Sequence, residues 1–258
     1  MKKYKVHMME RIGLLLKILA SALCLLAVFA LSSVMSKSGG AMGGAGTMQM
    51  VLIMFIYVGF IVLFFVFRKI FMIGFIRGNG IRITEKQFPD VFKAAQQMLQ
   101  DLAMRKMPNI YVMQSDGVLN AYATRFKLKN YIVIYSSIFE MAMKDKDILH
   151  FIMAHELGHV KRNHASKNFW LCLSSIVPFL QSFYSRGCEY TCDNIGKMLS
   201  PNGAENGLVL LVAGKELYEK VDVAEYMATT HEDNTFITKF VELFQTHPHM
   251  PKRIRNIK

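Results

Sequence analysis

Cysteine is scarce in this chain of 258 residues, and the placement of its four thiols excludes a secreted disulfide framework. Cys24 lies within a long apolar run, and the other three would lie in a reducing compartment under the topology inferred below. Cys188 and Cys192 are four residues apart and resemble half of a structural zinc site. Because no second cysteine pair and no histidine at finger spacing accompany them, we interpret both as structural thiols.

Acidic residues are also few, since 19 Asp and Glu stand against 31 Lys and Arg, a net charge of +12. The imbalance is local: residues 1–82 hold ten basic residues and one acid, net +9, whereas residues 83–258 hold 21 and 18, net +3. A surplus confined to the flanks of apolar runs is weak evidence for a nucleic-acid partner, and we expect none. The chain also has no internal repeat and no low-complexity tail.

Two long apolar runs lie near the N-terminus. Residues 12–35 form a 24-residue run whose only charge, Lys17, is near enough to its start to snorkel to the membrane surface. Residues 48–67 contain no charge over 20 residues, about 30 Å as a helix. The segment between them holds five glycines, and no A-x-A cleavage site follows the first run. We therefore expect two transmembrane helices in an uncleaved hairpin.

The charges around these runs predict their orientation. Four basic residues precede the first run and four follow the second, whereas the segment between the runs holds only Lys37. By the positive-inside rule, both ends of the hairpin face the cytoplasm. We therefore expect a multi-pass protein of the cell membrane, with its N-terminus in the cytoplasm. Residues 1–82 would be the membrane anchor and residues 83–258 a cytoplasmic domain.

The pattern of apolar residues in that domain predicts an α+β fold, mostly helical, with a small β-sheet. Asp145 and Asp147 offer capping oxygens at the start of one helix. The expected strands are residues 110–113, 119–124 and 131–135. The expected helices are residues 89–105, 147–164, 203–221 and 236–244, with residues 136–143 leading into the second of them.

Residues 155–159 read His-Glu-Leu-Gly-His. On a helix, His155 and His159 project from one face, one turn apart, and can hold a zinc ion with Glu156 beside it. The alternative is a buried helix that carries two histidines by chance. Gly158 is unfavourable within a helix by about 1 kcal/mol relative to Ala, so we expect a neighbouring segment to approach closely there. His164, nine residues after His155, falls on the opposite face and is expected at the surface.

A catalytic zinc ion takes three protein ligands and leaves its fourth position open. Glu189 and Asp193 are again four residues apart, on one face of a later predicted helix. We interpret Glu189 as the third ligand, with Asp193 accepting the second ring N–H of a ligand histidine. The alternative is that this Glu–Asp pair binds no metal and simply lies on a solvent-exposed face of its helix.

Four motifs in this order resemble one known family. They are His-Glu-Leu-Gly-His at 155–159, Asn-Ala-Tyr-Ala at 120–123, Ser-Arg-x-x-Glu-Tyr-x-x-Asp at 185–193 and His-Pro-x-x-x-x-Arg-Ile at 247–254. Over roughly residues 85–256 the chain resembles the HtpX and CAAX-prenyl-endopeptidase family of membrane-associated zinc metallopeptidases, peptidase family M48. The combination is far more specific than the first motif alone.

This resemblance implies a gluzincin-like fold with one zinc ion per chain. The zinc ligands would be His155, His159 and Glu189, supported by Asp193. The catalytic residues would be Glu156 as general base, with His247 and Arg253 stabilising the oxyanion. The substrate backbone would be held by Asn120, Ala121 and Tyr122.

Two features depart from the family pattern. Cys192 stands where the family usually has alanine, a small residue that cysteine can replace. Only 29 residues separate His159 from Glu189, whereas HtpX-type members carry two hydrophobic spans there. Within this interval, residues 169–184 are uncharged but give only about 24 Å of helix and contain Pro178. Because the zinc ligands must meet on one side of the membrane, we expect this segment to be a buried or membrane-abutting helix beside the site.

We therefore expect a membrane-anchored zinc endopeptidase that hydrolyses peptide bonds of membrane or misfolded proteins at the cytoplasmic face. Its partners would be a protein or peptide substrate and the membrane, and the sequence indicates no oligomeric state. The alternative is a catalytically inactive zinc-binding membrane scaffold, although such a protein need not keep Glu156. Cleavage within the bilayer is disfavoured because the polar residues 161–164 follow the zinc motif.

Overall fold

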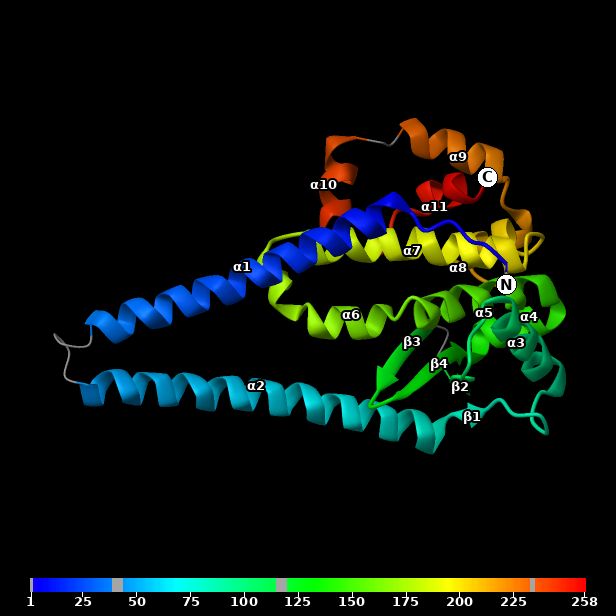
Figure 1. Ribbon diagram of the computed structural model, residues 1–258. Coiled ribbons are helices and arrows are strands. Elements are labelled where there is room, and N and C mark those ends of the chain that lie inside the picture. The colour runs from blue at the N-terminus through cyan, green and yellow to red at the C-terminus, as the bar shows by residue number, and fades with distance from the viewer. Residues whose placement is uncertain (1, 39–43, 115–119, 233–234) are drawn as a thin grey trace.

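The computed structural model describes residues 2–38, 44–114, 120–232 and 235–258. The fold is α+β and mostly helical, with one small mixed sheet, as the sequence predicts (Figure 1). The helices are α1 Met8–Ser38, α2 Gly44–Asn79, α3 Pro89–Asp101, α4 Ser136–Lys144, α5 Lys146–Lys161, α6 His164–Trp170, η1 Cys172–Ile176, α7 Leu180–Leu199, α8 Ala204–Ala213, η2 Tyr218–Lys220, α9 Val223–Glu232, α10 Phe236–Phe244 and α11 Met250–Ile257. The strands are β1 Ile81–Arg82, β2 Asn109–Met113, β3 Ala121–Phe126 and β4 Lys129–Tyr135.

The sheet has the strand order β1-β2-β4-β3. β4 pairs in parallel with β2 and antiparallel with β3, which it follows after a turn at Lys127, where φ is 52°. Ile132, Val133 and Ile134 are fully buried, so β4 forms the apolar centre of the sheet. The three expected strands are confirmed with small shifts of their ends, although Leu119 lies outside the described residues. β3 is left at the edge of the sheet, beside α5.

Helix α5 is the centre of the domain. Asp145 caps its N-terminus, because its side chain accepts hydrogen bonds from the backbone N–H groups of Asp147 and Ile148, as predicted. The apolar residues that follow are buried on nearly every side of the helix. A Cβ atom on Gly158 would lie only 3.1 Å from Sγ and 3.3 Å from Cα of Cys192 on α7. The predicted close approach at Gly158 is therefore the crossing of α5 and α7.

One expected helix is wrong as a single element. Residues 203–221 divide into α8 and the short η2, because Gly214 has a φ of 80° and ends α8. A positive φ is open to glycine at little cost and cannot continue a right-handed helix. The amide of Gly214 still donates to the carbonyl of Leu210, which closes the last turn.

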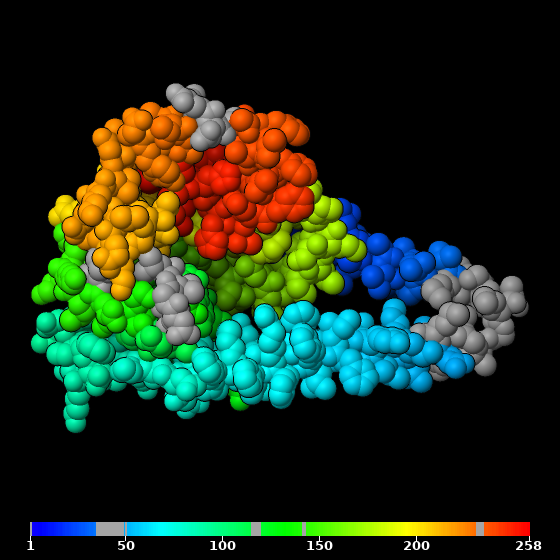
Figure 2. Space-filling model, turned by 180° about the vertical axis from the view of Figure 1, so that it is seen from behind, coloured from blue at the N-terminus to red at the C-terminus, as the bar shows by residue number. Residues whose placement is uncertain are grey.

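Helices α1 and α2 extend from the domain as two arms (Figures 1 and 2). Both are long and apolar enough to cross a membrane, over Met8–Val34 and Val51–Asn79. The first half of α1 packs along α7, and Gly187 permits this contact, because a Cβ atom there would lie 2.4 Å from the backbone nitrogen of Glu10. Lys17 does not snorkel: it is fully buried and donates hydrogen bonds to Asn168 and Gln181.

The inner end of α2 is also part of the domain. Lys69 donates a hydrogen bond to Thr124 of β3 over 2.8 Å. Ile73 and Ile76 are buried and form an apolar cluster with residues of β2 and β4, including Tyr111. Contacts of both helices therefore cross the predicted boundary between residues 82 and 83.

Residues 169–184 are not the single helix that the sequence predicts. They form the end of α6, then η1, then the first turn of α7, because Pro178 is followed by Phe179 in a left-handed conformation, with φ 63°. Phe169, Trp170 and Ile176 are 69%, 77% and 74% exposed. Figure 1 places this connection at the end of the domain from which α1 and α2 extend. Exposed apolar side chains of α10 are Phe236, Ile237, Phe240, Val241 and Phe244.

We predict that this end of the domain contacts the bilayer. Trp170 is the only tryptophan of the chain, so its fluorescence reports this surface directly. In nanodiscs it should be quenched by lipids that carry a spin label near the headgroup, because indole rings prefer the membrane interface. As a control, Trp170→Phe combined with Tyr226→Trp places the only indole on α9, where lipid quenching should be absent. Quenching of Trp170 by aqueous acrylamide but not by labelled lipid would contradict the prediction.

Candidate metal centre

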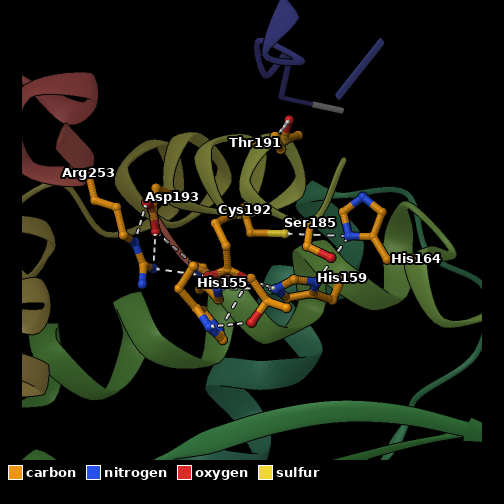
Figure 3. Close-up of polar contacts among 12 residues, drawn as sticks. His155, His159, His164, Ser185, Thr191, Cys192, Asp193 and Arg253 are labelled. Carbon is orange, nitrogen blue, oxygen red and sulfur yellow. Dashed lines mark hydrogen bonds and ion pairs between the residues drawn. The ribbon is translucent and has the colours of Figure 1, made fainter. Parts of the chain in front are cut away.

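The packing of α5 against α7 brings together the three expected metal ligands. His155 and His159 project from α5, with their Nε2 atoms 3.2 Å apart. Glu189 of α7 lies with Oε2 3.5 Å from Nε2 of His155 and Oε1 3.4 Å from Nε2 of His159. The two imidazoles are labelled in Figure 3 beneath α7. Glu189, which is 30 or more positions from either histidine in the sequence, thus lies next to both of them.

These distances fit a tetrahedral zinc site. Ligand atoms about 2.0–2.1 Å from a tetrahedral zinc ion lie roughly 3.3 Å from one another. The Nε2 atoms of His155 and His159 are 3.2 Å apart, close to one such edge, and each of them has one oxygen of Glu189 within 3.5 Å, Oε2 facing His155 and Oε1 facing His159. Two imidazole nitrogens and one carboxylate are also a ligand set that catalytic zinc takes, with the fourth position open.

Glu156 has the environment of a proton carrier. Its carboxyl group is buried, and its Oε2 atom has no hydrogen-bond partner among the described residues. Burial raises the pKa of this carboxyl group, against the opposing effect of His159 and His155. A buried oxygen without a protein partner, next to the ligand histidines, is placed to accept a proton from a water molecule at the site.

Asp193 holds the ring of His155, the first of the expected ligands. Nδ1 of His155 lies 2.9 Å from Oδ1 of Asp193, so an Nδ1–H donates to the carboxylate and leaves the Nε2 lone pair free for a metal. Arg253 in turn donates to both oxygens of Asp193, from Nε over 2.9 Å and from Nη2 over 2.7 Å (Figure 3). Burial alone would raise the pKa of Asp193, but Arg253 and His155 together lower it below its usual value.

Arg253 itself is only 4% exposed. Its Nη2 atom also lies 3.5 Å from Oε2 of Glu189, so one guanidinium contacts two buried carboxylates and balances one of their two negative charges. Because Nε and Nη2 face Asp193, the remaining Nη1 lies at the opposite edge of the guanidinium plane. The geometry thus gives Arg253 a role in holding Asp193 and Glu189, and its predicted action on the oxyanion would use Nη1.

The second ligand histidine contacts His164, which the sequence placed at the surface. That expectation is wrong, since His164 is 3% exposed and its Nδ1 atom lies 3.0 Å from Nδ1 of His159. The reason is a break in the helix: Asn163 has a φ of 54°, and the chain turns there from α5 into α6. A single helical wheel therefore does not apply across this residue, and no spacing pattern could have found His164.

The other expected site residues surround the metal ligands. His247 has a side chain that is 66% exposed, with Nε2 3.7 Å from Oε1 of Glu189. Ala121 and Tyr122 belong to β3 and pair with β4, while the carbonyl of Asn120 accepts a hydrogen bond from the backbone of Tyr135. Their other edge is free of strand pairing within the described residues. The role of these residues toward a substrate remains a prediction.

Cys192 offers an alternative third ligand. Its sulfur lies within 4.8 Å of the ligand nitrogens of His155 and His159. A metal binds the thiolate, however, and burial, assisted by the nearby carboxylates, raises the pKa of this thiol well above its usual value. We favour Glu189, because its oxygens lie within 3.5 Å of both nitrogens and its negative charge is already stabilised. Burial would raise the pKa of Glu189, but the two histidines and Arg253 lower it well below its usual value.

A family model for peptidase family M48 matches residues 85–176 and 167–258, which together are more than half of the chain. The chain belongs to peptidase family M48. This confirms the resemblance seen in the sequence, and it makes this M48 protein a member of a family of metallopeptidases.

The crystal structure of Ste24p from S. mikatae is similar to this M48 chain, with a TM-score of 0.47 and 15% sequence identity. The match covers 90% of this chain and 66% of that one, so this chain spans just under two thirds of the length of that protein. Among curated proteins, none matches the chain significantly.

We predict that Glu189→Ala abolishes zinc binding in this M48 protein, whereas Cys192→Ala leaves it intact. Loss of a direct ligand should reduce zinc affinity by more than the roughly 10–100-fold that loss of an outer partner costs. Competition with a fluorescent chelator measures both affinities. The assignment would be reversed if Cys192→Ala lost zinc and Glu189→Ala retained it.

Proposed function

We propose that this protein is a membrane-anchored zinc endopeptidase that hydrolyses peptide bonds of membrane or misfolded proteins at the cytoplasmic face. The observation that carries the proposal is the convergence of His155, His159 and Glu189, with 3.2–3.5 Å between the nearest nitrogen and oxygen atoms, beside a buried Glu156 oxygen that has no partner among the described residues. Membership of a metallopeptidase family supports it.

Each residue then has a chemical task. Zinc, when bound by the three ligands, would polarise the scissile carbonyl and acidify a water molecule. Glu156 accepts the proton of that water and delivers it to the leaving amine, a task suited to a carboxyl group whose pKa is raised by burial. His247, exposed beside Glu189, can donate a hydrogen bond to the oxyanion. The free edge of β3 can bind an extended substrate backbone as an added strand.

The membrane location supports the proposed substrate class. The basic residues that flank both apolar helices favour the cytoplasm for the domain. The exposed apolar side chains of α10 and of the connection from α6 to α7 lie at the end of the domain from which the arms α1 and α2 extend (Figure 1). A site held this close to the bilayer favours substrates that are themselves in or next to the membrane.

The alternative of an inactive zinc scaffold is less consistent with Glu156. An unpaired buried polar group costs about 1–3 kcal/mol of stability, and a scaffold gains nothing from it. An enzyme gains a proton carrier at the position where water would react.

We predict that Glu156→Gln retains zinc and folding but lowers turnover of an unfolded protein substrate by roughly 10²–10⁴-fold. The amide has nearly the same shape as the carboxyl group but accepts no proton. His155→Ala serves as the comparison, since it should lose zinc as well as activity. A native protein that binds zinc without cleaving any substrate would favour the scaffold, and full activity of Glu156→Gln would remove this residue from the mechanism.

We also predict that His247→Ala lowers kcat by about 10²–10³-fold while zinc affinity and thermal stability stay native. The side chain is 66% exposed and lies 3.7 Å from Oε1 of Glu189, so its removal should leave the packing of the domain intact. His249→Ala, two residues away in the same loop, is the matched control and should retain its activity. Equal and small effects of both substitutions would show that His247 is only a surface residue.

A further inference from the structure

The second nitrogen of His159 begins a chain of three buried groups that ends on α1. Nδ1 of His159 lies 3.0 Å from Nδ1 of His164, and Nε2 of His164 lies 3.2 Å from Oε1 of Glu10. Arg162 donates to the same Glu10 oxygen from Nε over 3.0 Å and from Nη2 over 2.8 Å. Glu10 is fully buried although it belongs to the first turn of an apolar helix. A buried carboxylate at such a position requires a compensating partner.

The position of each proton in this series of hydrogen bonds follows from which groups can donate and which can accept. Two Nδ1 atoms 3.0 Å apart share one proton between them. If His159 binds a metal through Nε2, its proton is on Nδ1 and is donated to His164. His164 then accepts at Nδ1 and carries its own proton on Nε2, which faces Glu10. In this arrangement His159 donates a hydrogen bond to His164, and His164 donates one to Glu10.

The last link, between His164 and Glu10, is short, but its hydrogen-bond angle is unfavourable. Nε2 of His164 and the second oxygen of Glu10, Oε2, are both buried without an aligned hydrogen-bond partner among the described residues. Because the two groups are 3.2 Å apart at their nearest atoms, a small rotation of the carboxylate aligns them.

We infer that His164 and Glu10 are positioning residues for the ligand His159, so that the N-terminal helix α1 completes the metal centre. The inference rests on the proposed zinc site. It gives His159 the same support that His155 has: a ring N–H held by a chain that ends in a carboxylate bound by arginine. For His155 the carboxylate is Asp193 and the arginine Arg253. For His159 they are Glu10 and Arg162, with His164 as the intermediate.

A second metal ion at this place is the competing interpretation, since Glu10, His164 and Cys188 could supply three ligand atoms. The surrounding charges oppose it. Arg162 already contacts the Glu10 oxygen, and Lys167 lies 4.0 Å from it. Burial also raises the pKa of Cys188, which disfavours the thiolate that a metal would need. Arg162 and Lys167 already place positive charge at this position, and Nδ1 of His164 already contacts His159.

The test measures zinc affinity of the full chain in nanodiscs, by competition with a fluorescent chelator, together with the visible spectrum of the Co²⁺-substituted protein. We expect Glu10→Gln and His164→Leu to lower zinc affinity by roughly 10–100-fold, as loss of an outer partner does. The Co²⁺ absorption bands should shift in both variants, because the imidazole of His159 is no longer held. His164→Asn should recover part of the affinity, because its amide oxygen replaces Nδ1 as the acceptor.

Lys17→Met is the matched control. Lys17 is fully buried in the same contact between α1 and α7, but its hydrogen bonds within the described residues go to Asn168 and Gln181 and not to His159, His164 or Glu10. It should lower thermal stability without changing zinc affinity or the Co²⁺ spectrum. The inference is overturned if Lys17→Met loses as much affinity as Glu10→Gln, if His164→Leu binds zinc like the native chain, or if the native chain binds two zinc ions and loses one in His164→Leu. Failure of the proposed function is distinct, because the native chain would then either bind no zinc that depends on His155 or bind zinc without cleaving any substrate.

Discussion

The close crossing of α5 and α7 is the contact on which the rest of the structure depends. At Gly158 the two helices are so near that an added methyl group would meet both the sulfur and the Cα atom of Cys192. This closeness is what allows imidazoles from α5 and the Glu189 carboxylate from α7 to meet at separations of 3.2–3.5 Å. Helices at their usual distance of 8–10 Å with larger side chains between them would hold these groups apart.

The same crossing concentrates buried negative charge. Glu156, Glu189 and Asp193 are all nearly inaccessible to water, and three carboxylates in so small a volume repel one another. Arg253 contacts two of them and balances one of their two negative charges. Burial alone would lower the pKa of His155, but Asp193 and Glu189 raise it to about 10, which shows how strongly the cluster attracts a cation. A divalent metal would satisfy that attraction more fully than one proton, and its binding would release that proton.

Sequence reasoning succeeded where function depends on local helical spacing. The four-residue intervals between His155 and His159, and between Glu189 and Asp193, predicted which side chains share a face, and the structure brings these faces together. The cap at Asp145 and the places of the three expected strands were equally local and are confirmed, whereas the two-residue strand β1 was not predicted. The metal ligand set itself stays a prediction until a metal is measured.

Sequence reasoning failed where a residue in the left-handed conformation ends a helix, and where a partner distant in the sequence determines the position of a side chain. Asn163, Phe179 and Gly214 each interrupt a helix that apolar spacing alone would continue. Lys17 was expected at the membrane surface, but its partners lie more than 150 positions away on α6 and α7. A charged residue in an apolar run therefore has two physical solutions, water or a buried partner, and only the tertiary structure distinguishes them.

The attachment of α1 to α7 also sets an order of events during synthesis. Gly187, against which Glu10 packs, follows it by 177 residues, which at ribosomal rates is a delay of roughly 10–35 s. Arg253, which holds Asp193, is made later still. The apolar hairpin is thus available to the membrane long before the groups that orient His155 and His159 exist. Under the proposed function, a nascent chain would be inserted first and become able to cut only afterwards, which protects the insertion machinery and the chain itself from premature cleavage.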